Sequence, residues 1–189
     1  LRLYLLGAID ARLGDSAACS RAAELQTISG SPDAEALARD LAHSVRAYQA
    51  FWHGEFGAAL EVLEEARMAP RQIFMVLQSP FYNQTAERWL KAELLQRLGR
   101  FDEARRWYES LAQASLYDLI YLAPSHLRRA EICERLGALD QAAEHYRQVV
   151  ELWRECDPEL RPMVTEATAR LERLEPGPAR GSGDRLRIV

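Results

Sequence analysis

Four glycines recur along the sequence at nearly regular intervals. They are Gly14, Gly54, Gly99 and Gly137, and the intervals between them are 40, 45 and 38 residues. Each follows an amphipathic stretch rich in the helix formers Ala, Leu, Glu and Arg, and each precedes another such stretch. A regular period in this range is typical of stacked helical repeats. We therefore predict an all-α chain in which each glycine forms the turn inside a helix hairpin.

The residues around the four glycines follow a common register. Seven positions before the glycine the residue is Gly7, Ala47, Ala92 or Ala130, and five positions after it the residue is Cys19, Ala59, Ala104 or Ala142. Small residues at matched positions on two consecutive helices allow the helices to approach closely. We therefore expect the three alanines of the second set to be buried. Cys19, in the same position of the first hairpin, is predicted to be a buried, inert thiol.

The positions of glycine and proline predict four hairpins and a closing helix. The expected helix pairs are 1–13 and 15–29, 32–53 and 55–68, 80–98 and 101–114, and 124–136 and 139–155. A last helix over 158–174 would cover the open end of the stack, as solenoids require. Residues 1–174 then form one helical-repeat domain, and we expect a disordered tail over 175–189.

The register resembles that of the tetratricopeptide repeat, a helix hairpin of 34 residues. The family's small residue, turn glycine, apolar residue and alanine match Ala92, Gly99, Phe101 and Ala104, and again Ala130, Gly137, Leu139 and Ala142. The family's large apolar residue early in the first helix is replaced by Arg88 and His126, and Trp89 and Leu127 follow one place later. The resemblance covers roughly residues 1–156 and implies an α-α superhelix, a solenoid of about four hairpins with a capping helix.

In tetratricopeptide proteins the first helix of each hairpin lines a concave groove that holds a peptide or a partner helix. The resemblance therefore implies a non-catalytic protein-binding or scaffold module. A second copy of the chain, held through the end hairpins, is a further candidate partner. The candidate groove residues are Tyr48, Trp52, Trp89, Glu93, Arg97, Glu131 and Arg135. Trp89 would be the apolar anchor, and Arg97 and Arg135 would bind acidic groups of the partner. Packing between hairpins is the competing role for the tryptophans, and helix-stabilising Glu–Arg pairs are the competing role for the charges.

The histidines and cysteines are spaced too irregularly to predict a metal site. They are His43, His53, His126 and His145, with Cys19, Cys133 and Cys156, and none has the spacing of a zinc ribbon or a paired-histidine helix. Clustered carboxylates such as Glu61, Glu64 and Glu65 lie near arginines at helical spacing, which favours solvated ion pairs. We expect no catalytic group, no cofactor and no bound metal.

Composition narrows the kinds of partner. A net charge of −4 over 189 residues, without a basic stripe, argues against direct nucleic-acid binding. The sequence contains no run of about 18 apolar residues, so it predicts no membrane-spanning helix. The odd cysteine count suits a reducing compartment, so we expect a cytoplasmic protein. Lys91 is the one lysine among 24 basic residues, which we interpret as the base composition of a GC-rich bacterial genome.

Two connections, 69–82 and 115–123, are long and rich in apolar residues. We expect them to pack on each other as a satellite core. The alternatives are an exposed docking patch or a pocket closed by these connections, which would make the chain a small-ligand sensor. The passage over 121–130 resembles the C-terminal repeat regions of bacterial multidomain regulators, such as serine/threonine kinases and transcriptional activators, and implies a regulatory segment of a larger protein.

Overall fold

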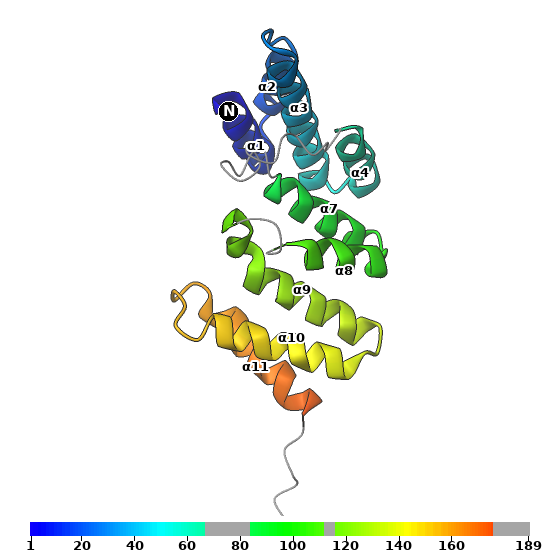
Figure 1. Cartoon of the computed structure of the whole chain (residues 1–189), viewed down its shortest axis with the longest axis vertical. Helices are drawn as coiled ribbons and strands as arrows, with labels where there is room; N and C mark the ends of the chain where they lie inside the picture. Colours follow the sequence, from blue (N-terminus) through cyan, green and yellow to red (C-terminus); the bar gives the residue numbers. More distant parts are fainter. Residues whose placement is uncertain (67–83, 112–115, 176–189) are drawn as a thin grey trace, which may run out of the picture. The chain divides into compact units, whose positions relative to one another are not determined.

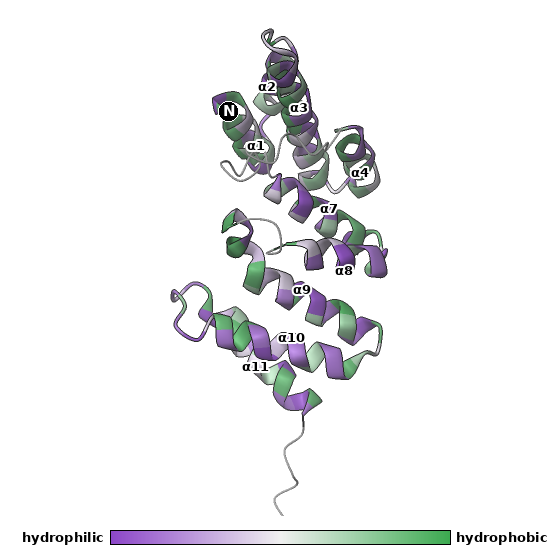
Figure 2. Cartoon of the chain, viewed as in Figure 1, coloured by the Kyte–Doolittle hydropathy of each residue, from purple (hydrophilic) through white to green (hydrophobic). Residues whose placement is uncertain are grey.

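The computed structural model describes residues 1–66, 84–111 and 116–175, and in these ranges every regular element is a helix (Figure 1). The chain divides into two compact units, Leu1–Leu122 and Ala123–Val189. Figure 2 shows hydrophobic and hydrophilic residues alternating around the helices, the pattern of helices that bury one face. The predicted all-α, tetratricopeptide-like architecture is confirmed.

The first unit contains three helix hairpins and a short 3-10 helix. The hairpins are α1 (Arg2–Leu13) with α2 (Ala17–Gln26), α3 (Pro32–Trp52) with α4 (Phe56–Glu65), and α7 (Thr85–Arg97) with α8 (Phe101–Ser110). Within the unit α1 and α2 also pack against α3, and α7 packs against both α3 and α4. The 3-10 helix η1 (Leu116–Tyr121) lies against α7. The six α-helices begin and end within a few residues of the predicted positions.

The second unit contains the fourth hairpin and the closing helix. The hairpin is formed by α9 (Leu122–Arg135) and α10 (Leu139–Leu152), and α11 (Arg161–Leu174) packs against α10. Ala130, Cys133, Ala142, Tyr146 and Val149 are buried in its core together with Ala167 of α11. The last helix therefore covers an apolar face of the hairpin, as the sequence predicts for a capping helix.

Each of the four glycines ends a helix in the left-handed conformation. Their φ angles are +71°, +81°, +76° and +74° for Gly14, Gly54, Gly99 and Gly137. At Gly99 the glycine N–H donates to the Gln96 carbonyl, and the next N–H, of Arg100, donates to the Leu95 carbonyl. This pair of bonds is the Schellman motif, which satisfies carbonyls that a helix end leaves unpaired. The same pair of bonds recurs at the other three glycines, so the predicted turn is confirmed in every hairpin.

Small residues set the distance between paired helices. Ala59, Ala104 and Ala142 are each 0% exposed, as predicted. Gly7 shows the same constraint between α1 and α3, because a Cβ added there would lie 3.0 Å from both methyl carbons of Val45. The helices approach so closely at these positions that a longer side chain has no space.

The expectation for Cys19 is wrong, because this cysteine is exposed and Ala18 is buried in its place. The reason lies in the first turn of α2, where the amides of Ala18 and Cys19 donate to carbonyls three residues earlier. In α4 the corresponding amide, of Ala59, donates four residues back. A 3-10 turn takes 3.0 residues instead of 3.6, so the buried face of α2 arrives one residue early.

The expected satellite core is also wrong for the residues of the second connection that the structure describes. Leu116, Leu119 and Ile120 are exposed, and the fully buried residue of η1 is instead Asp118. The first connection, 69–82, lies outside the described residues, as does the tail beyond residue 175.

We predict that Ala59→Leu lowers the free energy of unfolding by about 1–3 kcal/mol, because the added atoms overpack the α3–α4 contact. The matched control is Ala58→Leu, the adjacent and exposed position of the same helix, where we expect a change within about 0.5 kcal/mol. Urea unfolding of both variants measures the difference. Equal stabilities would contradict the predicted packing.

Candidate functional site

The seven candidate groove residues fall in both units. Tyr48 and Trp52 lie on α3, Trp89, Glu93 and Arg97 lie on α7, and Glu131 and Arg135 lie on α9. The first five belong to the first unit and the last two to the second. Their surroundings differ sharply, and they separate into residues held within their unit and residues open to solvent.

Trp89 is half-buried between two aromatic rings of its own unit. Its ring stacks on Tyr121 of η1 with centroids 4.9 Å apart, and it meets Tyr108 of α8 edge to face at 5.1 Å. Such pairs contribute about 0.5–1.5 kcal/mol beyond the burial of their area. Trp89 therefore holds η1 against the third hairpin.

Glu93 is buried inside the third hairpin. The Tyr108 hydroxyl lies 2.8 Å from its Oε1 and 2.9 Å from Oε1 of Gln96. Tyr146 occupies the position of Tyr108 in the fourth hairpin and donates to Glu134 over 2.6 Å. In both hairpins the tyrosine nine residues after the turn glycine thus bonds to a polar side chain of the preceding helix.

Tyr48 lies beside a buried carboxyl that joins the first and third hairpins. Glu87 of α7 is 3% exposed, and the Tyr4 hydroxyl of α1 donates to its Oε1 over 2.8 Å. Burial is the main cause of the raised pKa values of Glu87, Tyr4 and Tyr48. Glu87 is not among the candidate residues identified from the sequence. The one signal was its spacing to Leu90 and Leu94, which places Glu87 on the buried face of α7.

We predict that Glu87→Gln changes the pH dependence of stability. A carboxyl with a raised pKa in the folded chain binds protons more tightly there than in the unfolded chain, so its contribution to stability declines as the pH rises above about 4.3. Glutamine does not titrate. The unfolding free energy of the variant, relative to that of the wild type, should therefore rise between about pH 4 and pH 7. Urea unfolding across this range measures the difference. Parallel profiles would refute the assignment, and Glu61→Gln, at an exposed position, is the control.

Arg88 occupies the position where the tetratricopeptide pattern has a large apolar residue. Its guanidinium donates to Oδ1 of Asp118 over 2.5 Å and to the Ser110 carbonyl over 3.1 Å. Thr85 donates to the same Asp118 oxygen over 2.7 Å. Asp118 is 0% exposed, so this ion pair is shielded from water and fixes η1 to α7. The departure from the family pattern therefore has a local structural reason.

We predict that Asp118→Ala lowers the free energy of unfolding by about 3–5 kcal/mol, because it leaves the Arg88 charge in a poorly solvated site. The double variant Arg88→Leu/Asp118→Leu removes both charges and should recover most of this loss. Thermal or urea unfolding of the two proteins gives the comparison. A double variant as unstable as Asp118→Ala would show that the loss comes from packing rather than from the unpaired charge.

Trp52 and Arg97 belong to an exposed group around the turn of the second hairpin. Trp52 is 49% exposed, and the Arg12 guanidinium lies 5.7 Å from its ring centroid. Phe51 contacts both Trp52 and Phe56, and the Arg97 guanidinium lies 5.6 Å from the Phe56 centroid. We name these five residues the aromatic–arginine edge. Its two arginines come from the first and third hairpins, each two residues before its turn glycine.

The second unit has its own polar features. Glu131 pairs with Arg128 over 3.0 Å, and Arg135 lies exposed in the last turn of α9. On the inner side of the hairpin, Nδ1 of His126 lies 3.1 Å from Nδ1 of His145. The spacing of 19 residues between these histidines gave no indication that they would meet.

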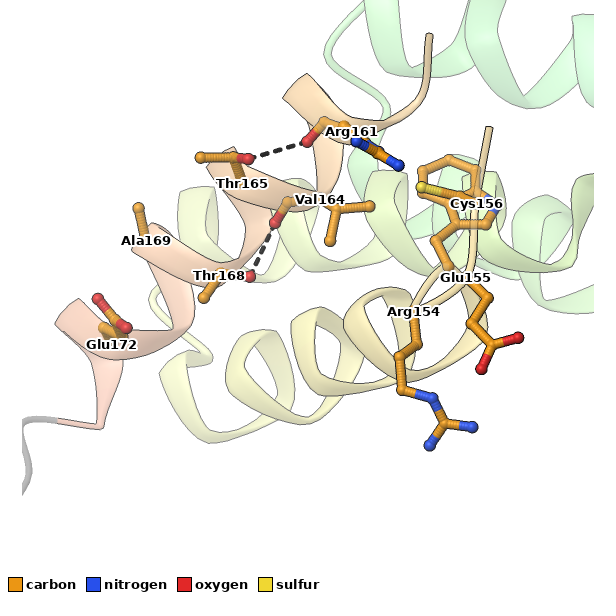
Figure 3. A pocket seen from close by; sticks show the side chains of 10 residues that line it. Arg154, Glu155, Cys156, Arg161, Val164, Thr165, Thr168, Ala169 and Glu172 are labelled. Carbon is orange, nitrogen blue, oxygen red and sulfur yellow. Dashed lines mark hydrogen bonds between the residues drawn. The ribbon is translucent and has the colours of Figure 1, made fainter. Parts of the chain in front are cut away.

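An open hollow of about 880 Å³ lies along α11 in the second unit (Figure 3). Its lining residues are Trp153, Arg154, Glu155, Cys156, Arg161, Val164, Thr165, Thr168, Ala169 and Glu172. The hydroxyls of Thr165 and Thr168 donate to carbonyls of their own helix, at Arg161 and Val164. Cys156 and Arg161 lie at one end and Glu172 at the other (Figure 3), so the hollow gathers few polar groups toward one point.

The described ranges hold neither a metal-binding cluster nor a membrane-spanning helix. No group of three or more histidine, cysteine or acidic side chains is arranged there to hold a metal ion. None of the helices in these ranges combines the length and the apolar character needed to cross a bilayer.

Comparison with known proteins identifies one family. The model of the tetratricopeptide repeat matches residues 84–155, which correspond to the third and fourth hairpins, α7 to α10. No curated protein and no solved structure matches the chain. The match supports a tetratricopeptide-repeat protein, a class that generally mediates protein–protein interaction or scaffolding and is typically non-catalytic.

Proposed function

We propose that this chain is a non-catalytic protein-binding module whose partner docks on the aromatic–arginine edge of the first unit. Trp52 is the apolar anchor, and Arg12 and Arg97 bind acidic groups of the partner. The partner is accordingly a peptide or helix that carries an apolar side chain flanked by carboxylates. The observation that carries this proposal is the half-exposed Trp52 with an arginine from the neighbouring hairpin against its ring.

The composition of the edge supports a binding role. Tryptophan, tyrosine and arginine dominate the residues whose truncation weakens protein interfaces most. A large aromatic ring that is half open to water has apolar area left to bury, whereas a packed ring has little. Contacts of Arg12 with Trp52 and of Arg97 with Phe56 restrict both side chains before a partner arrives, which reduces the entropy lost on binding.

The anchor proposed here differs from the one that the sequence suggested. Trp89 already contacts Tyr108 and Tyr121, and Glu93 already accepts a hydrogen bond from Tyr108. Using either residue for a partner would first require these internal contacts to break. Arg97 keeps its proposed role, because it lies exposed beside Phe56.

The wider setting is part of the same proposal. In the second unit, Glu131 and Arg135 of α9 keep their proposed role as charged contacts for a partner. The chain acts as a regulatory segment of a larger, cytoplasmic bacterial protein, which is supported by the resemblance over 121–130 and by the near-absence of lysine. The small-ligand alternative gains no support from the hollow along α11, because none of its lining residues belongs to the two long connections.

We predict that Trp52→Ala reduces partner capture at least tenfold, because hot-spot truncations cost about 2 kcal/mol or more. The immobilised wild type and variants would be exposed to lysate of the source organism, and the captured proteins quantified by mass spectrometry. Arg12→Ala/Arg97→Ala should weaken capture of the same proteins, and more so at low salt, where the charge contribution is larger. Circular dichroism would verify that each variant keeps its fold.

The matched control is Arg39→Ala, which removes an exposed arginine from the N-terminal half of α3, whereas Trp52 is the last residue of that helix. This variant should capture as much as the wild type. Identical proteins in equal amounts from Trp52→Ala and the wild type would remove the aromatic–arginine edge from consideration. The exposed residues of η1, Leu116, Leu119 and Ile120, would then be the next surface to test.

A further inference from the structure

The two histidines of the fourth hairpin face each other across the helix pair. Nδ1 of His126 on α9 lies 3.1 Å from Nδ1 of His145 on α10, with ring centroids 5.2 Å apart. We propose that these two nitrogens are a binding site for one divalent transition-metal ion of the type that prefers imidazole, namely Zn²⁺, Ni²⁺ or Cu²⁺.

The separation of the nitrogens allows both of them to bind one ion. Imidazole nitrogens bind zinc at about 2.0–2.1 Å. Two nitrogens 3.1 Å apart at that bond length subtend about 100° at the ion, between the octahedral and tetrahedral angles. Both side chains are half-buried rather than enclosed, so an ion can reach them from solvent and can keep water in its remaining positions.

The protonation state of His126 also suits a metal. Each imidazole must be neutral and must present its Nδ1 lone pair. Burial, followed by the charge of Arg129, lowers the pKa of His126, which favours its neutral form at neutral pH. In the pair without metal, one Nδ1 carries the hydrogen that the other accepts. Metal binding moves that hydrogen to Nε2 of the same ring, so no net proton is released when both rings start neutral.

The surrounding charge is mixed. Arg129 lowers the pKa of His126, whereas the Glu144 carboxylate raises it. Glu144 itself pairs with Arg147. Among the described residues no third histidine, cysteine or acidic side chain completes a metal-binding group. The site is therefore open and exchangeable. Two nitrogen ligands without a carboxylate also disfavour Mg²⁺ and Ca²⁺, which prefer oxygen.

The comparison between hairpins indicates that the pair is not required for packing. His126 and His145 lie 11 residues before and 8 residues after Gly137. The residues at the same offsets from Gly99 are Arg88 and Trp107, so the third hairpin forms with different chemistry at both positions. Of these two hairpins, only the fourth has two imidazoles that face each other. His126 lies where the family pattern has a large apolar residue.

The experiment uses the full, untagged chain with Cys19→Ser and Cys156→Ser, because these two thiols are not buried and would bind metal themselves. Isothermal titration at pH 7.5 with Zn²⁺, Ni²⁺ and Mg²⁺ should give one Zn²⁺ or Ni²⁺ per chain and no binding of Mg²⁺. His126→Gln and His145→Gln should each weaken binding at least tenfold. His53→Gln, at an exposed histidine of the first unit, should bind as the parent does.

A spectroscopic measurement distinguishes this site from any other. The Cu²⁺ complex of the parent should show electron paramagnetic resonance couplings to two nitrogens, and each histidine variant should lose at least one. Lowering the pH to 5.5 should weaken binding, because protons compete for the rings. The proposal is overturned if the parent binds no Zn²⁺ or Ni²⁺, or if both variants retain its affinity while circular dichroism shows intact folds.

Discussion

The close contact between paired helices is the constraint on which the other features of this structure depend. A left-handed glycine returns the chain after each first helix, and an alanine without exposed surface sets the distance at which the second helix packs. Alanine fills space at no cost in side-chain entropy but buries little apolar area. Much of the remaining specificity then falls on buried polar pairs. Tyr108 bonds to Glu93 inside the third hairpin, and Arg88 bonds to Asp118 between that hairpin and η1.

The sequence predicted the hairpins because the information is local. The turn glycine, the small residues and the helical periodicity are all separated by a few positions, and together they specify where each helix begins and ends. The failure at Cys19 was equally local in its cause. A tighter first turn in α2 rotated the buried face by one residue. The one local difference in sequence is Ser16, at the position where the other three hairpins have a phenylalanine or a leucine.

The polar pairs were not predictable, because each partner is chosen by tertiary contact. Glu87 looks like an ordinary acidic residue of a first helical turn until Tyr4 reaches it from α1. The same limit applied to the candidate site. Trp52 and Trp89 look equivalent in sequence, and only the position of η1, with Tyr121 stacked on one of them, separates a packed ring from an open one.

The bond between Tyr4 and Glu87 has a consequence for how the first unit unfolds. Helical arrays usually behave as one-dimensional chains in which each repeat interacts only with its immediate neighbours, so their ends can fray one repeat at a time. Here a residue of the first hairpin bonds to a residue of the third, across 83 positions of sequence and past the second hairpin. Detaching α1 would expose the buried carboxyl of α7 and weaken a repeat that is not its neighbour. The first and third hairpins are thereby coupled directly, so detachment of the terminal repeat also costs the third hairpin a buried hydrogen bond.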